Sequence, residues 1–340
     1  MRRIIGYVLV GLGVFGIVLG LLLRFYAYDR LAIVPLNQQS KSISVGDDMT
    51  VFYPSKYPAQ KEAEDGVEVT ATRVVRGDPT APEAKPDGNV MVWDVGVVLE
   101  DTDGVVISAS LDHLCLDRRT NEAVQPCSGE GIEDNEDDNT IDSDDIVEHS
   151  GLAYKFPFGT EQRDYPYFDN FTKRAETMRF VGTETVADVE TYKFEQKVPL
   201  TKIDDRQVPG ELVGRPDQRI VNIGRYYENT RTVWVEPYSG IIVKGTEDLS
   251  QTLRDANGRP ALTLFEGGIG FTDETIQEAA ADAKDARSQL RLISETGPLV
   301  LVIGGVVLLL VGLALALLGD RGQPAAGPQT GSHRRELQPQ

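Results

Sequence analysis

The sequence predicts an α+β membrane protein: a β-rich antiparallel ectodomain of barrel or sandwich type, joined to a juxtamembrane amphipathic helix, between two transmembrane helices. Three observations predict this fold class. Long uncharged apolar runs lie near both ends of the chain. Short alternating runs separated by turn residues fill most of the region between them. A single stretch with helical spacing precedes the second apolar run. Alternation favours strands, and a fully apolar run of membrane length favours a spanning helix.

The first predicted element is a transmembrane helix over residues 4–23, after a cytoplasmic N-terminus of residues 1–3. The run contains no charged residue, and roughly 20 helical residues cross the ~30 Å hydrocarbon layer of a bilayer. A cleaved signal peptide is the alternative, but its apolar region usually has only about 7–15 residues. No clear small-x-small cleavage site follows Leu23, so we predict a retained anchor.

The second predicted transmembrane helix covers residues 299–318 and is followed by a tail of residues 319–340. Arginines precede the first span and lie in the tail, and positively charged flanks stay in the cytoplasm. Arg24 and Arg30 follow the first span and weaken this bias. Two spans place both termini on one side. The predicted localisation is therefore the plasma membrane, with both termini cytoplasmic and the central domain extracytoplasmic.

The predicted β-rich domain covers residues 24–272. Its strand-like runs are rich in β-branched and aromatic residues, and Gly, Asn, Asp and Pro mark the turns between them. The predicted strands are 67–76, 90–99, 105–116, 177–184, 189–198, 219–223, 231–235, 241–244 and 261–265.

An amphipathic helix is predicted over residues 273–296. Its apolar residues, most of them alanine, recur at helical spacing, with charged residues on the other side. Thr275 and Glu278 have the spacing of an N-terminal capping box. Gly297 and Pro298 are a stop signal before the second span. The alanine-rich face predicts close packing against a neighbouring surface.

The charge of the chain restricts its partners. The sequence has 53 acidic and 34 basic residues, for a formal net charge of −19. Such a surface repels nucleic-acid phosphates and anionic headgroups, so nucleic acid is not a predicted partner. Lipid tails held in an internal cavity are compatible with it.

The two cysteines, Cys115 and Cys127, both fall in the predicted outer domain. An oxidising outer compartment makes a disulfide the expected state. The alternative is a Cys–His nucleophile, suggested by His113 two residues before Cys115. A disulfide-bonded cysteine has no thiolate to offer, so the disulfide is the prediction.

An acidic run follows the second cysteine and gives weak candidates for a metal site. The spacing resembles a calcium-binding loop, but Asn139 stands where glycine is needed and no flanking helices are predicted. A solvated loop is the simpler interpretation. We therefore predict no metal site and keep these residues only as weak candidates. The candidate ligands are Asp134, Glu136, Asp138, Asp142 and Asp145.

The segment 151–169 concentrates aromatic residues well above their frequency elsewhere in the chain. Such a cluster either lines an apolar ligand cavity with tyrosine hydroxyls at its rim or forms the aromatic core of a β-domain. The candidate cavity residues are Tyr154, Phe156, Phe158, Tyr165, Tyr167 and Phe168.

Sequence motifs for catalysis and for cofactor binding are missing. The chain has three histidines, and it contains no G-x-S-x-G, H-E-x-x-H, Walker or G-x-G-x-x-G motif. A carboxylate pair could serve a glycosidase, but no pair stands out among so many acidic residues. We therefore predict no catalytic residues, no cofactor and no enzymatic activity.

The layout of the chain and two of its stretches, 151–169 and 233–248, resemble the actinobacterial PorA-like porin family, formerly a domain of unknown function. The resemblance covers nearly the whole chain. It implies a cell-envelope protein, either a porin, as the family name says, or a protein of envelope lipoglycan maturation. The arrangement is also similar in layout to class B scavenger receptors, which hold a β-rich ectodomain with a lipid tunnel between two terminal helices.

The leading prediction is a non-enzymatic envelope protein whose outer domain binds or conveys a membrane lipid or lipoglycan. The alternatives are a membrane scaffold for envelope glycosyltransferases, with those biosynthesis enzymes as partners, a porin or channel, and a glycan hydrolase.

Overall fold

The computed structural model describes residues 2–134, 141 and 145–318. The chain divides into two compact units. One is a helical unit formed by the two ends of the chain, and the other is the β-domain, Asp29–Arg291. The predicted fold class, a β-rich antiparallel domain with two terminal apolar helices, is confirmed.

The helical unit contains helices α1 (Arg2–Leu22) and α4 (Gly297–Leu318). Each adjoins a short π-helical segment, η1 (Leu23–Ala27) and η4 (Leu292–Thr296), respectively. Two helical stretches of the described chain, Arg2–Ala27 and the one that ends at Leu318, are long and apolar enough to cross a membrane by length and composition.

Glycines form the contact between α1 and α4. Gly6, Gly13 and Gly20 are the buried residues of α1, and they recur every seven positions. A Cβ placed on Gly13 would lie 2.6 Å from the carbonyl oxygen of Gly305. The two backbones therefore approach more closely than any side chain permits, as small residues allow in membrane helix pairs.

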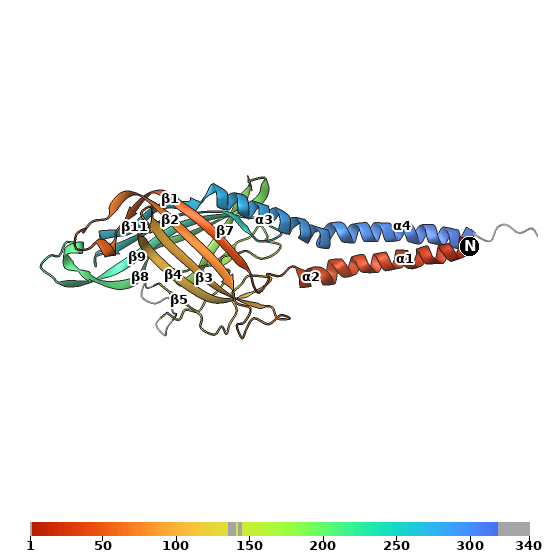
Figure 1. Ribbon diagram of the computed structural model, residues 1–340, viewed down its shortest axis with the longest axis horizontal. Coiled ribbons are helices and arrows are strands. Elements are labelled where there is room, and N and C mark those ends of the chain that lie inside the picture. Colours follow the sequence, from red (N-terminus) through yellow and green to blue (C-terminus); the bar gives the residue numbers. More distant parts are fainter. Residues whose placement is uncertain (1, 135–140, 142–144, 319–340) are drawn as a thin grey trace, which may run out of the picture. The chain divides into compact units, whose positions relative to one another are not determined.

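The β-domain is one strongly curved, 11-stranded antiparallel sheet in the described chain (Figure 1). The strand order is β5-β4-β3-β2-β1-β11-β10-β9-β8-β7-β6. Strands that follow one another in the sequence are neighbours, except β5 and β6, which form the two ends of the sheet, and β1 pairs with β11. The strands are β1 (Gln39–Val51), β2 (Glu64–Gly77), β3 (Val90–Asp101), β4 (Val106–Asp117), β5 (Gly131–Glu133), β6 (Tyr165–Asp169), β7 (Arg174–Val186), β8 (Val189–Pro209), β9 (Ile220–Val235), β10 (Ile242–Arg254) and β11 (Pro260–Phe271). Short helices are α2 (Tyr28–Leu31), η2 (Pro54–Lys56) and η3 (Gly210–Val213).

Short backbone bridges connect the two ends of this half-barrel. Leu152 donates its N–H to the Pro166 carbonyl and accepts from the Phe168 N–H, both at 2.8 Å, which attaches it to β6. On the other side, the Ala123 N–H donates to the Gly151 carbonyl at 2.8 Å. The segment that follows β4 is thereby joined to β6, and these bonds satisfy backbone groups that a free sheet edge would expose.

The concave side of the sheet is the inner face of the domain. Its largest central cluster takes side chains from six strands, β1, β2, β8, β9, β10 and β11. The members are Met49, Val51, Tyr53, Val69, Val198, Tyr227, Leu249 and Phe265. Contacts across so many strands require the curvature, because a flat sheet would keep these side chains apart.

Helix α3 (Asp273–Arg291) packs on the outer face of the sheet. Ala280 and Ala283 are fully buried against Trp234 and Val243. The alanine-rich face therefore does pack closely. The capping box predicted at Thr275 is wrong: the Thr272 hydroxyl accepts the Thr275 N–H at 3.2 Å and caps the helix.

Candidate functional site

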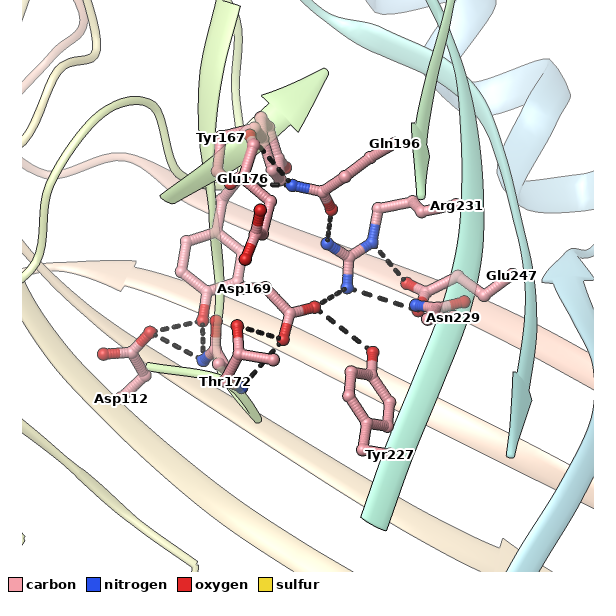
Figure 2. Close-up of polar contacts among 12 residues, drawn as sticks. Asp112, Tyr167, Asp169, Thr172, Glu176, Gln196, Tyr227, Asn229, Arg231 and Glu247 are labelled. Atoms are coloured by element: carbon pink, nitrogen blue, oxygen red, sulfur yellow. Dashed lines mark hydrogen bonds and ion pairs between the residues drawn. The ribbon is translucent and has the colours of Figure 1, made fainter. Parts of the chain in front are cut away.

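An arginine at the centre of the inner face holds side chains from four strands together (Figure 2). Arg231 of β9 donates to Glu247 of β10 at 3.0 Å and to Gln196 of β8 at 2.7 Å. It also pairs with Asp169 of β6 at 3.4 Å. Asn229 donates to the second oxygen of Glu247 at 2.7 Å. We refer to these five residues as the Arg231 cluster.

Strand register places this cluster. Arg231 lies directly opposite Glu247 on one neighbouring strand and opposite Gln196 on the other. Residues opposite one another on antiparallel strands share a face and hold their side chains about 5 Å apart. Alternation along β9 then puts Tyr227 and Asn229 on the same inner face.

The Arg231 cluster is a buried network of charges. Burial favours the neutral acid at Glu247, but the adjacent Arg231 outweighs it and lowers the pKa of Glu247. Burial also opposes the charge of Arg231, and the carboxylates of Glu247 and Asp169 outweigh it, which raises the pKa of Arg231. The arrangement keeps Arg231 and Glu247 ionised, and the contacts of Arg231 tie four strands together.

A second buried group lies beside the Arg231 cluster on the inner face. We call it the His149 cluster; its members are His149, Glu130, Asp112, Tyr154 and Asn170. His149 is enclosed by two carboxylates: its Nδ1 is 2.8 Å from Glu130, and its Nε2 is 3.0 Å from Asp112 of β4. The Nε2 contact is close but not aligned for a hydrogen bond, so we treat it as an ion pair. Asp112 also accepts hydrogen bonds from the Tyr154 hydroxyl and, at 3.0 Å, from Asn170.

The two carboxylates decide the protonation of His149. Burial favours the neutral imidazole, but the contacts with Asp112 and Glu130 outweigh it and raise the pKa of His149 to about 9. At neutral pH the ring is an imidazolium with a carboxylate on each side, which fastens the segment after β5 to β4.

A second arginine, Arg73 of β2, also reaches the inner face. Its guanidinium carbon is 5.6 Å from the centre of the Tyr154 ring. Its Nε is buried and has no hydrogen-bond partner in the described part of the chain. The structure thus contains one interior arginine with several partners and another that stacks on a ring.

The six aromatic residues proposed to line a cavity contribute to the core. Phe156, Tyr165 and Tyr167 belong to one packed cluster, in which the Phe156 ring lies 5.5 Å from Tyr165 and 5.7 Å from Tyr167. Phe168, Tyr154 and Phe158 pack in a neighbouring cluster. This packing is what the core interpretation expects. Their role in lining a ligand cavity stays a prediction.

The candidate cation ligands fall mostly outside the described chain. Glu136, Asp138 and Asp142 lie outside the described residues. Asp134 is 3.7 Å from Arg225, and Asp145 is buried. No group of three or more metal-ligating side chains occurs among residues 2–134, 141 and 145–318. A cation site in this run stays a prediction.

The predicted disulfide is present. Cys115 of β4 bonds to Cys127, and no free cysteine occurs in the described chain. A nucleophilic role for Cys115 is therefore excluded in this state. His113 donates from its Nδ1 to the Asp94 carboxylate, 2.6 Å away, rather than to a sulfur atom.

Two open hollows are present, of about 500 and 620 Å³. The larger one is lined by strands β8 to β11 and includes Glu228, Asp248 and Glu266. The smaller one includes Lys61, joined to Glu211 at 2.6 Å. Neither hollow includes any of the six aromatic residues above.

Comparison with known proteins identifies the family. The family model "Porin PorA" matches residues 5–314, which cover the whole β-domain and most of both apolar helices. The chain belongs to the PorA porin family. It is 26% identical to "Porin PorA" of Corynebacterium amycolatum over 93% of this chain and 99% of that protein. It is also 26% identical to "Porin PorA" of Corynebacterium resistens over 72% of this chain and 76% of that protein.

The predicted resemblance to the PorA family is thereby confirmed. The two apolar helices fit a membrane protein, and the porin name of the family points to the cell envelope. The family name favours the porin alternative over the lipid-binding prediction.

Sequence reasoning missed the buried polar residues Arg73, His149 and Arg231. Each is a single charged or polar residue in a segment that otherwise reads as loop or strand. The only available signal was the two-residue period of a strand. Every second residue points to the same face, so Asn229 and Arg231 share a face with Tyr227 and Val233 and must be buried with them.

Proposed function

We propose that this chain is a subunit of an envelope channel, and that the passage for solutes forms between several copies of it. Its membership in a family whose relatives are named porins is the observation that carries the proposal. The proposed role is non-enzymatic, with both termini in the cytoplasm and the β-domain outside.

The helical unit supports placing the passage between copies. Gly13 and Gly305 bring α1 and α4 into backbone contact, so no lumen separates them. Two helices in one chain cannot enclose water in a bilayer, because every backbone and polar group there needs protein or water around it. A ring of several helix pairs can.

The β-domain supports the same placement. The Arg231 cluster and the central apolar cluster occupy the middle of the inner face, and Tyr227, Phe156 and Phe194 are fully buried there. Its strands form a half-barrel with packed side chains at the middle of the inner face, which differs from a closed membrane barrel with a lipid-facing apolar band.

The test is solute flux through liposomes that contain the purified full-length chain. We expect stepwise conductance in planar bilayers and swelling in small sugars, both rising more steeply than the first power of the protein-to-lipid ratio. Heat-unfolded protein is the control. Absence of flux at every ratio would overturn the proposal, and a strictly linear dependence would move the passage into a single copy.

A further inference from the structure

We propose that Arg73 is the centre of a binding site for a singly charged oxyanion, a phosphodiester or a carboxylate, on the inner face of the β-domain. This inference goes beyond the channel proposal and does not depend on it.

Strand pairing fixes the position of Arg73. It lies in β2, directly opposite Ser42 of β1 and Val97 of β3. Its guanidinium lies over the ring of Tyr154, which belongs to the His149 side of the interior. The charged end of Arg73 therefore extends over the inner face, away from the outer surface of the sheet.

The contrast with Arg231 is the first argument. Arg231 uses its donors on Glu247, Asp169 and Gln196. Arg73 has five N–H donors of the same kind, yet among the described residues it has no ion pair, and its buried Nε has no hydrogen-bond partner. The buried Nε–H of Arg73 thus lacks an acceptor among the described residues, and a bound oxyanion would supply one.

The nearby carboxylates do not fill this role because other donors already hold them. Asp112 accepts from Tyr154 and Asn170. Glu247 accepts from Arg231 and Asn229. The protein thus provides local negative charge near Arg73 but no free carboxylate positioned to bond with it.

Space around Arg73 is the second argument. Its neighbours on the β1 side are small: Ser42 lies beside it, and Ser44 faces Ala71 two residues along the strand. All four residues are only partly buried, so solvent reaches this part of the inner face. The serine hydroxyls lie on the same face as Arg73 and would add donors for an oxyanion.

The surrounding charge selects the ligand class. Glu247 and Asp112 carry negative charge on the same face, and Glu247 lies close enough to interact electrostatically with Arg73. A doubly charged phosphate would be repelled more strongly than a singly charged group. A phosphodiester has one charge and two free oxygens that match the guanidinium fork, and it occurs both in lipid headgroups and in soluble molecules.

The test uses the full chain in an uncharged maltoside detergent. Dimethyl phosphate and dihexanoyl phosphatidylglycerol are titrated at constant ionic strength, with chloride as reference, up to about 50 mM, which detects a Kd in the millimolar range. Binding is followed by calorimetry and by the rise in the thermal midpoint that a ligand of the folded state produces.

Arg73→Met is the test variant, and Arg76→Met, which removes an exposed arginine of the same strand, is the matched control. We expect wild type and Arg76→Met to bind, and Arg73→Met to lose at least about 10-fold in affinity, the value of one charged hydrogen bond. If Arg73→Met does not fold, Arg73→Lys replaces it as the test variant. Lysine keeps the positive charge but lacks the paired N–H donors of the guanidinium, so we expect this variant to bind more weakly than wild type.

The outcomes separate the sources of the ligand. Tighter Arg73-dependent binding of the lipid assigns the site to a headgroup, and equal binding of both probes assigns it to a soluble phosphodiester. Binding that is the same in Arg73→Met and wild type, or no binding of either probe, would overturn the proposal. None of these results alters the flux measurement that tests the channel.

Discussion

His149 shows how two carboxylates turn a buried histidine into a permanent cation at neutral pH. The ring is 2% exposed and lies between Glu130 and Asp112. Two ion pairs offset the cost of burying its charge. The side chain therefore links β4 to the segment that follows β5.

The first prediction concerns the pH dependence of the stability that protonated His149 contributes. The pKa of His149 rises from 6.5 to about 9 on folding, so the folded state holds the proton more tightly. The stabilisation is complete below about pH 6.5 and is lost as the pH rises through about 9, a change of roughly 3 kcal/mol at most. We expect His149→Gln to lower the free energy of unfolding strongly at pH 6 and weakly at pH 9.5.

Urea unfolding at several pH values measures this difference. His113→Gln is the comparison: the hydrogen bond with Asp94 also raises the pKa of His113, so we expect a penalty of the same sign but smaller, because His113 has one half-exposed carboxylate partner. A His149→Gln penalty that is the same at pH 6 and pH 9.5 would show that the ring contributes only packing.

The second residue-scale prediction concerns Arg231. Arg231→Met would leave Glu247 and Asp169 buried without their cation, which typically costs about 3–5 kcal/mol. Arg174→Met removes an exposed arginine paired with Glu176 and is expected to change stability by less than about 1 kcal/mol. Thermal unfolding of both variants checks this, and equal midpoints would contradict the structural role of the Arg231 cluster.

At the scale of elements, the seven-residue spacing of the buried glycines defines how α1 meets α4. Two glycines two residues apart differ sharply in their surroundings. A Cβ on Gly13 would meet the Gly305 carbonyl at 2.6 Å, whereas a Cβ on Gly11 would meet nothing within 4 Å. This pair offers a matched test of the helix contact.

We expect Gly13→Leu to separate the helix pair and Gly11→Leu to leave it intact. The two variants add the same apolar volume to the same helix, so their membrane insertion should be equal. Titration of the full chain with SDS, followed by circular dichroism, should give a lower midpoint for Gly13→Leu only. A lower midpoint for both variants would count against a contact mediated by Gly13.

The strands show a different relation between sequence and element. The predicted strands 219–223 and 231–235 are the two ends of one strand, β9. The predicted strand 241–244 is only the beginning of β10. The missed parts of β9 and β10 carry two members of the Arg231 cluster, Asn229 and Glu247. Polar residues on an inner face remove the alternation that identifies a strand.

At the scale of the whole molecule, the chain is a polar domain between two apolar helices, and its topology can be tested directly. Cys115 and Cys127 are bonded to each other, so a new cysteine would be the reactive thiol. We expect Thr102→Cys, in the exposed turn between β3 and β4, to react with a membrane-impermeant maleimide in intact cells. Ser332→Cys, in the C-terminal tail, should react only after lysis, and the reverse pattern would invert the proposed orientation.

The sequence alone determined the features that depend on hydrophobicity along the chain. Two uninterrupted apolar runs require a bilayer whatever the fold between them, and alternating β-branched runs with regular turns require an antiparallel sheet. The pairing of Cys115 with Cys127 also followed from their number and location. These features depend on single residues or short stretches, so no knowledge of distant neighbours was needed.

Only the tertiary structure decided which residues share the interior. Arg231, Glu247 and Asp169 are far apart in the sequence and meet because β6, β9 and β10 curve around one face. Arg73 and Arg231 are the same residue type in similar strands, yet one is surrounded by acceptors and the other is not. A buried charge is stable or unstable according to its partners, and the partners are set by strand register and sheet curvature, which local sequence does not encode.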